Sequence, residues 1–202
     1  SQGLLKVGIV SPDLWTHSVA NFLIPLFKYY DRDEFHLTCY SDTQVPDETT
    51  EMLKRCSNSW REIRNLGDEF VAKKIKSDTI DILIDLAGHT GNNRLTLFAR
   101  RAAPIQINWL GYPTTTGLSQ MDFRLTDVIA DPPGLTEAFH SEVLVHLQPC
   151  FLCYSPPNEI PLLKVKHRPV TFGSFNNFAK LTEKTAHLWA QLMNRVPASR
   201  LV

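Results

Sequence analysis

The chain has 202 residues, of which 43% are hydrophobic and 21% are charged, and its 21 Lys and Arg residues balance its 21 Asp and Glu residues. These fractions are typical of a folded globular protein, and the absence of net charge gives no reason to expect a nucleic-acid or membrane partner. No apolar run approaches the roughly 20 residues needed to span a bilayer, and residues 1–6 lack the pattern of a signal peptide. We therefore expect a cytoplasmic protein.

The four cysteines are too few to indicate a disulfide scaffold in a chain of this length. Cys150 and Cys153 have the spacing of a zinc or redox motif, but no second pair of ligands follows them. We interpret both as small apolar residues of a strand, and we expect Cys39 in a buried strand and Cys56 near a helix end. The sequence thus predicts no bound metal and no cofactor.

Hydrophobic periodicity divides the chain into alternating strands and helices. Short runs rich in β-branched residues predict strands, and apolar residues that recur every three or four positions predict amphipathic helices. In chain order, we predict a strand at 4–10, a helix at 17–30, a strand at 35–41, a helix at 47–56, a strand at 60–63, a helix at 68–76, a strand at 79–87, a helix at 94–100, and strands at 105–109, 123–126 and 143–147.

The alternation of largely apolar strands with helices favours an α/β fold: a parallel sheet covered by helices on both faces. We predict a Rossmann-like domain at 1–154 and a linker at 155–168, where Ser and Pro accumulate. Residues 169–202 then begin a second Rossmann-like domain, with a strand at 170–174, a polar turn at 176–182, a helix at 183–195 and the start of a strand at 199–202. The chain is interpreted as a fragment of a two-domain protein.

Several common catalytic motifs are missing from this pattern. The turn after the first strand has no G-x-G-x-x-G, and the chain contains no Walker A lysine motif, no H-E-x-x-H and no G-x-S-x-G. Dinucleotide chemistry, phosphate-loop hydrolysis, zinc proteolysis and serine hydrolysis therefore have no support. Asp122 and Asp127 are either acids or loop caps, and without an Asp-x-Asp we expect no metal-bridged diphosphate.

Two polar turns carry the residues best suited to a ligand. Residues 88–95 follow the strand at 79–87, and residues 103–117 contain a strand and then a turn rich in Gly, Pro and Thr. Ligands bind at the carboxyl ends of strands in an α/β sheet, and such turns expose N–H groups that suit anionic or hydroxylated ligands. The candidate site is expected there.

Two histidines lie at strand ends. His17 either begins the helix by hydrogen bonding or acts as a base that takes a proton from a hydroxyl acceptor. His89 either stabilises its turn or contacts a ligand. The remaining histidines are predicted to be structural or surface residues: His36, His140, His146, His167 and His187.

Lys180 lies just before a predicted helix start, where free N–H groups and the positive end of the helix dipole attract phosphate. With Asn176, Asn177 and Thr182 nearby, it is a candidate contact for a nucleotide diphosphate. The alternative is a solvated surface lysine.

Four separated motifs together resemble the catalytic region of the O-GlcNAc transferase and SPINDLY-like glycosyltransferases. The match is specific because the motifs occur in the family's order and extend from about Leu5 to the last residue. They are residues 7–14 with His17, residues 81–90, residues 103–117 with Met121 and Asp122, and residues 175–180.

This resemblance implies a two-domain GT-B architecture and metal-independent, inverting transfer from a nucleotide sugar to a Ser or Thr hydroxyl of a protein. His17 matches the family's histidine that is proposed as the base or as a donor or acceptor contact. The other residues assigned to donor or substrate binding are His89, Thr90, Leu110, Gly111, Tyr112, Pro113, Asn177 and Lys180. Asn177 stands where the family has Gln, and Ala179 replaces the Tyr that some relatives have before the lysine.

The resemblance leaves the donor open between UDP-GlcNAc, which we favour from the family's general use, and GDP-fucose, which the SPINDLY type uses. It also implies two parts beyond this sequence: a tetratricopeptide array that selects protein substrates, and most of the nucleotide-binding domain. The isolated chain is therefore expected to be inactive. A different possibility is a catalytically silent half that serves as a protein-binding module.

Overall fold

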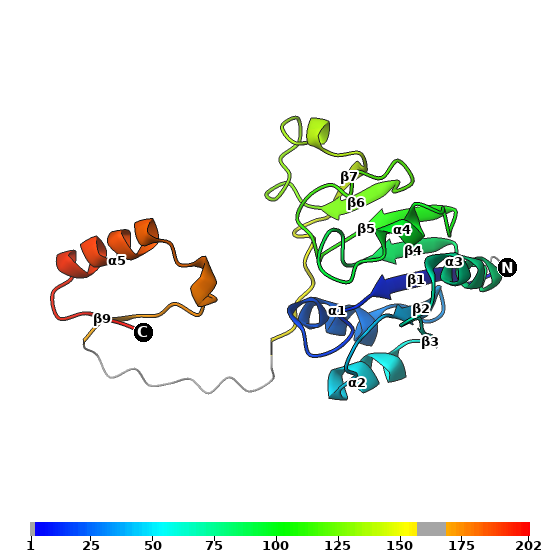
Figure 1. Cartoon of the computed structure of the whole chain (residues 1–202), viewed down its shortest axis with the longest axis horizontal. Coiled ribbons are helices and arrows are strands. Elements are labelled where there is room, and N and C mark those ends of the chain that lie inside the picture. The colour runs from blue at the N-terminus through cyan, green and yellow to red at the C-terminus, as the bar shows by residue number, and fades with distance from the viewer. Residues whose placement is uncertain (1–2, 157–168) are drawn as a thin grey trace. The chain divides into compact units, whose positions relative to one another are not determined.

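The chain divides into two compact units, Ser1–Pro156 and Pro157–Val202, and the computed structural model describes residues 3–156 and 169–202 of them (Figure 1). Positions 157–168 of the predicted linker, including His167, lie outside the described residues.

A seven-stranded sheet forms the centre of the first unit, with the order β3-β2-β1-β4-β5-β6-β7. Each neighbouring pair of strands is parallel, which confirms the predicted α/β fold with a Rossmann-like parallel sheet. The strands are β1 (Leu5–Ser11), β2 (Phe35–Ser41), β3 (Ser59–Glu62), β4 (Ile82–Asp85), β5 (Ile105–Asn108), β6 (Phe123–Thr126) and β7 (Val143–His146).

Helices cover both faces of this sheet, so the unit has two apolar cores (Figure 1). Successive side chains of a strand point to opposite faces, and Ile9 and Val10 of β1 accordingly enter different cores. Helices α1 (Ser18–Tyr29) and α2 (Glu48–Cys56) pack on the face of Ile9, whereas α3 (Asp68–Ser77) and α4 (Leu95–Phe98) pack on the face of Val10. A short 3-10 helix, η1 (Glu137–Phe139), precedes β7.

In the first unit, two predicted elements are shorter in the structure by three residues or more. The strand predicted at 79–87 is confined to Ile82–Asp85, because the Asp85 carboxylate accepts hydrogen bonds from the Ala87 and Gly88 amides and turns the chain out of the sheet. The helix predicted at 94–100 has one turn, Leu95–Phe98. Arg101 has a φ of 50°, a left-handed conformation that a continuing α-helix does not adopt.

The interpretation of Cys150 and Cys153 as strand residues is wrong. Strand β7 ends at His146, and both cysteines lie exposed in the irregular segment beyond it. Pro149 lacks the N–H that a ladder needs, so pairing does not continue along this segment. Cys39 is buried in β2 and Cys56 ends α2, as predicted.

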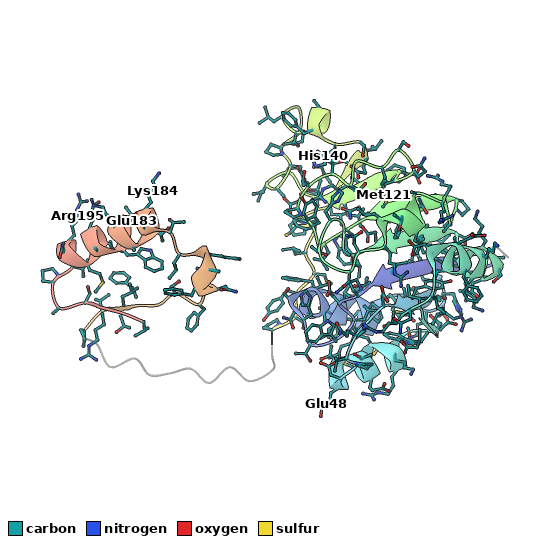
Figure 2. All side chains as sticks on the ribbon, in the orientation of Figure 1. Glu48, Met121, His140, Glu183, Lys184 and Arg195 are labelled. Atoms are coloured by element: carbon teal, nitrogen blue, oxygen red, sulfur yellow. The ribbon has the colours of Figure 1, made fainter. Side chains whose placement is uncertain are left out.

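The second unit contains a strand–helix–strand segment. Strand β8 (Thr171–Phe172) pairs in parallel with β9 (Arg200–Leu201), and η2 (Phe178–Lys180) and α5 (Glu183–Arg195) connect them. Helix α5 has an acidic residue in its first turn and Arg195 in its last (Figure 2), an order that suits the helix dipole. None of residues 169–202 is buried, so the described part of this unit has no core of its own.

Candidate active site

The order of the strands reverses direction beside β1. From β1 the chain continues to β2 and β3 on one side and then to β4 on the other side. Ligands of open α/β sheets bind at the carboxyl ends of the strands at such a point. Because β1, β4 and β5 are parallel, the loops that follow them leave the sheet at the same edge. These loops carry His17, residues 88–94 and residues 109–117.

A cavity of about 430 Å³ opens at this edge. It brings together four residues that the sequence predicted for the site, which come from three separate loops: His17, Thr90, Leu110 and Gly111. The rest of the lining is Asp13, Ser18, Val19, Phe22, Gly91, Phe151 and Leu152. The wall thus combines an imidazole, a carboxylate and hydroxyls with apolar side chains, a combination suited to a polar ligand with an apolar face.

His17 is the N-cap of α1. Its Nδ1 accepts a hydrogen bond of 3.3 Å from the Val19 amide, and its ring stacks on Trp15 with the centroids 5.7 Å apart. An amide N–H can only donate, so Nδ1 carries no proton while this bond exists, and the proton of a neutral ring is on Nε2. The ring nitrogen that remains for a ligand is therefore a donor.

This arrangement bears on the two roles considered for His17. A neutral donor can orient a sugar or an acceptor hydroxyl without any change in the ring. A base needs Nε2 to be free of its proton, and for this Nδ1 must exchange its cap bond for another partner. The Asp13 carboxylate lies 3.9 Å from Nδ1. Burial raises the pKa of Asp13. The observed cap bond favours the donor role.

Two glycines allow the loops at this edge to approach each other closely. At Gly111, an added Cβ would lie 1.8 Å from the Leu86 carbonyl oxygen. At Gly88, which has a φ of 54°, it would lie 2.4 Å from Cβ of Tyr112. Real Cβ atoms do not make such contacts, so the loop after β5 crosses the end of β4 only because neither position carries a side chain.

Three other predicted residues of these loops are absent from the lining of the cavity: His89, Tyr112 and Pro113. His89 donates from Nε2 to the Thr116 carbonyl oxygen at 2.9 Å and meets the Tyr112 ring edge-on, with centroids 5.2 Å apart. Pro113 is exposed on the same loop. In this structure His89 therefore links the turn after β4 to the loop after β5, which is the turn-stabilising role that the sequence left open.

Sequence analysis did not identify Phe151 and Leu152 as wall residues. The Phe151 amide donates to Asp127 Oδ2 at 3.1 Å, and the Phe151 carbonyl accepts from the Trp109 indole at 3.0 Å. The backbone N–H bonds from Ala130 and Phe151 lower the pKa of Asp127 to about 2, so this carboxylate caps loops. These contacts join residues that are far apart in the sequence, so no local sequence pattern predicts them.

Asp122 is also a cap, because its carboxylate accepts from the Gln106 amide at 2.7 Å and from Arg101 at 2.8 Å. Phe22, in contrast, belongs to the apolar stripe predicted for the helix at 17–30, but it faces the cavity from α1. Periodicity could identify its helix face without showing that a cavity lies beside it.

In the second unit, Asn177 and Lys180 occupy the two ends of η2. The Asn177 side chain accepts a hydrogen bond of 3.0 Å from the Ala179 amide, and Lys180 is exposed at the last position. Helix α5 begins directly afterwards, with Thr182 as its N-cap. An exposed cation close to a helix N-terminus is a suitable place for a phosphate.

Within residues 3–156 and 169–202, no group of three or more His, Cys, Asp or Glu side chains is arranged to hold a metal ion. In the same residues, none of the helices combines the length and apolar character needed to cross a bilayer.

Comparison with known proteins identifies the family. The model of glycosyl transferase family 41 matches residues 1–167. The chain belongs to this family. Similar proteins include a probable UDP-N-acetylglucosamine–peptide N-acetylglucosaminyltransferase SPINDLY of Oryza sativa subsp. japonica, 43% identical over 207 residues. The corresponding SEC protein of Arabidopsis thaliana is 29% identical over 213 residues.

The family-41 chain also matches a solved structure, that of a mutant O-GlcNAc transferase of Thermobaculum terrenum, with a TM-score of 0.89 and 35% identity. In each comparison 98% of the chain is covered, but it spans only 22% of the rice relative, 21% of the SEC protein and 38% of the solved chain. The similarity thus concerns one segment of longer proteins.

The crossing at Gly111 yields a first prediction for this family-41 chain. We expect Gly111→Ala to lower the free energy of unfolding by several kcal/mol, because a Cβ 1.8 Å from the Leu86 carbonyl forces the loop off the sheet. The matched control is Gly91→Ala, since nothing lies within 4 Å of a Cβ added there. Urea unfolding of both variants tests this; equal effects would contradict the close crossing.

The cap bond of His17 yields a second prediction. In the neutral ring, Nδ1 should appear as the unprotonated nitrogen and Nε2 as the protonated one in long-range ¹⁵N–¹H correlation spectra recorded at about pH 8, well above the usual histidine pKa. Val19→Pro, which removes the donated amide proton, should weaken the preference to that of an unbonded imidazole. A ring protonated on Nδ1 in the unaltered chain would contradict the donor role.

Proposed function

We propose that the protein containing this chain is a glycosyltransferase that moves a sugar from a nucleotide sugar to Ser or Thr hydroxyls of proteins, with inversion and without a divalent metal. The observation that carries this proposal is the cavity at the carboxyl edge of β1, β4 and β5, in a chain that belongs to a glycosyltransferase family. Its lining unites His17, Thr90, Leu110 and Gly111. The family resemblance assigns Leu110 and Gly111 to the sugar and acceptor cleft and His17 to the base or a substrate contact, and Thr90 is among the predicted substrate-binding residues.

Within this proposal, His17 donates a hydrogen bond from Nε2 to an oxygen of the sugar or of the acceptor. The Thr90 hydroxyl donates to the Ala87 carbonyl at 2.8 Å, so its lone pairs remain for a ligand hydroxyl. Leu110 and Gly111 form the adjoining wall. Lys180, with Asn177 and the start of α5, binds the nucleotide diphosphate. A lysine and a helix N-terminus together supply positive charge that a metal ion otherwise provides.

UDP-GlcNAc is the donor we propose, since the relatives in rice and Arabidopsis carry UDP-N-acetylglucosamine in their names. One observation favours GDP-fucose as a second candidate. The chain is 40–43% identical to six SPINDLY proteins but 29% identical to the SEC protein, and the SPINDLY type is the one for which the resemblance implies GDP-fucose.

The direct test is a transfer assay with the full-length protein. Labelled UDP-GlcNAc and GDP-fucose are supplied separately, each with a library of Ser- and Thr-containing peptides and with an Ala-substituted library as the control. We expect label from one donor only in the Ser and Thr library, at the same rate in excess EDTA. Loss of transfer in EDTA, with rescue by magnesium or manganese, would refute the metal-independent mechanism. No transfer from either donor would favour the binding module.

The same protein tests the diphosphate contact. Lys180→Ala should weaken binding of the accepted nucleotide about ten- to hundred-fold, because a charge-assisted hydrogen bond contributes about 1.5–3 kcal/mol. Arg195→Ala is the matched control, since Arg195 is also an exposed cation but lies in the last turn of α5, away from the helix start. Calorimetric titration with UDP and GDP measures both variants. Equal affinity in the two variants would show that Lys180 is a surface lysine without a ligand.

A further inference from the structure

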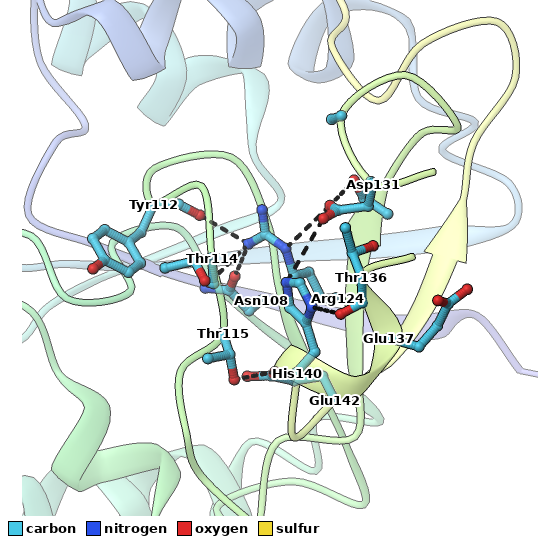
Figure 3. A network of polar contacts seen from close by, with 12 residues as sticks. Asn108, Tyr112, Thr114, Thr115, Arg124, Asp131, Thr136, Glu137, His140 and Glu142 are labelled. Carbon is cyan, nitrogen blue, oxygen red and sulfur yellow. Dashed lines mark hydrogen bonds and ion pairs between the residues drawn. The ribbon is translucent and has the colours of Figure 1, made fainter. Parts of the chain in front are cut away.

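A buried cation, the guanidinium of Arg124, binds the loop that follows β5 and crosses the end of β4. Nη1 of Arg124, in β6, donates to the carbonyl oxygens of Tyr112 at 2.8 Å and Thr114 at 3.2 Å, and to Asn108 Oδ1 at 2.8 Å (Figure 3). Only 3% of Arg124 is exposed. A buried guanidinium is expensive to desolvate, so its position beneath this loop calls for an explanation beyond a surface ion pair.

A buried carboxylate holds the other side of the same loop. Glu142, which directly precedes β7, accepts from the Thr116 amide at 2.7 Å and from the Thr115 hydroxyl at 2.8 Å, and also from the Thr116 hydroxyl. The cation thus binds the carbonyl groups of the loop and the anion binds its donors. Together, Arg124 and Glu142 bind carbonyl oxygens as well as N–H and O–H donors of residues 112–116.

The Arg124 guanidinium also lies near a buried carboxylate, that of Asp131. Its Nε makes no hydrogen bond and lies 3.9 Å from Asp131 Oδ2, and Nε2 of the buried His140 ring lies 3.8 Å from Asp131 Oδ1 (Figure 3). His140 Nδ1 donates to the Thr136 carbonyl at 3.0 Å, which leaves Nε2 directed at the carboxylate. Removal of Arg124 alone would therefore release the loop and also leave the buried Asp131 carboxylate without its cation, with the Thr126 hydroxyl and the His140 ring as its remaining neighbours.

We propose that Arg124 is a positioning residue of the candidate active site. It acts through the 112–116 loop: by holding the Tyr112 carbonyl, it keeps Leu110 and Gly111 in place as the cavity wall. Leu110 has a φ of 78°, a conformation that a leucine retains only when its surroundings impose it. This inference rests on the proposed function for what the wall binds, and it assigns the effect of Arg124 to the acceptor side, apart from the nucleotide contacts of Lys180.

The test separates positioning from stability with a charge-balanced double variant. Arg124→Met/Asp131→Asn removes the clamp on the loop and also the charge that would be stranded, so it should recover most of the melting temperature that Arg124→Met loses. In the full-length protein we expect its kcat/KM for the acceptor peptide to fall about ten- to hundred-fold through a raised KM, with unchanged nucleotide affinity. If the double variant does not fold, Arg124→Lys replaces it, because lysine keeps the charge without the planar fork.

The matched control is Arg101→Met. Arg101 also binds carbonyl oxygens, of Gln120 at 2.7 Å and Pro104 at 2.5 Å, and a carboxylate, Asp122 at 2.8 Å, but it does so at the amino ends of β5 and β6. It should lower stability without raising the acceptor KM. Wild-type KM in the Arg124 double variant, or an equally raised KM in Arg101→Met, would overturn the proposal.

Hydrogen exchange provides a readout that does not need activity. The hydrogen-bonded amides of Thr116, Gly117 and Leu118 should exchange at least about tenfold faster in the double variant than in the unaltered protein, whereas the amides of β4 should not change. Unchanged protection of the loop would overturn the positioning role. If the unaltered protein transfers no sugar, the proposed function fails, but the exchange result still decides whether Arg124 holds the loop.

Discussion

A row of buried polar side chains across three neighbouring strands is the constraint on which the candidate site depends. Asp85, Asn108 and Arg124 occupy adjacent register positions on β4, β5 and β6. They are connected by hydrogen bonds of 2.9 Å and 2.8 Å. Parallel strands buried on both faces are normally apolar throughout, so a polar row here adds a cost of desolvation. Its members offset that cost by binding the backbone of the loops that form the cavity.

Each end of this row fixes a different loop. Burial raises the pKa of Asp85, and the amides of Ala87 and Gly88 and the side chain of Asn108 counteract that rise by donating to its carboxylate. At the other end, Arg124 binds the carbonyls of the loop after β5. The turn after β4 and the loop after β5 are therefore positioned by one connected network. His89, which bonds to the Thr116 carbonyl, closes the connection on the outer side.

A site held in this way suits a reaction that depends on orientation. The hydrogen bond from the Val19 amide fixes the His17 ring at the start of α1, and the buried network fixes Leu110 and Gly111, which line the same cavity. Transfer of a sugar to a hydroxyl requires two substrates to meet in one geometry, and much of the rate of such a step can come from holding them there. The wall held by the buried network and the His17 ring oriented as a hydrogen-bond donor are consistent with that requirement.

The sequence predicted the elements better than their contacts. Strands such as β1 and β4 were predictable because each contains a short apolar run, Val7–Val10 and Ile82–Ile84, as burial on both faces of the sheet requires. The end of β4 was not, since it is set by the side chain of Asp85 binding amides beyond it. Four site residues converge as expected from the strand ends, which local pattern can locate. The role of Arg124 and the wall contributed by Phe151 depend on partners 10 to 42 positions away, and periodicity carries no record of those partners.

The unfolding free energy of Asp85→Asn tests the central role of the polar row most directly. Asparagine has nearly the same shape, but it has one acceptor oxygen where the carboxylate has two. The Ala87 amide donates to one carboxylate oxygen, and the Gly88 amide and Asn108 donate to the other, so at least one of these donors must face the new amide nitrogen, which cannot accept. Urea unfolding should show a loss of about 1–3 kcal/mol, the cost of leaving a buried donor unsatisfied. A stability within about 0.5 kcal/mol of the unaltered chain, as for an ordinary surface substitution, would contradict the account.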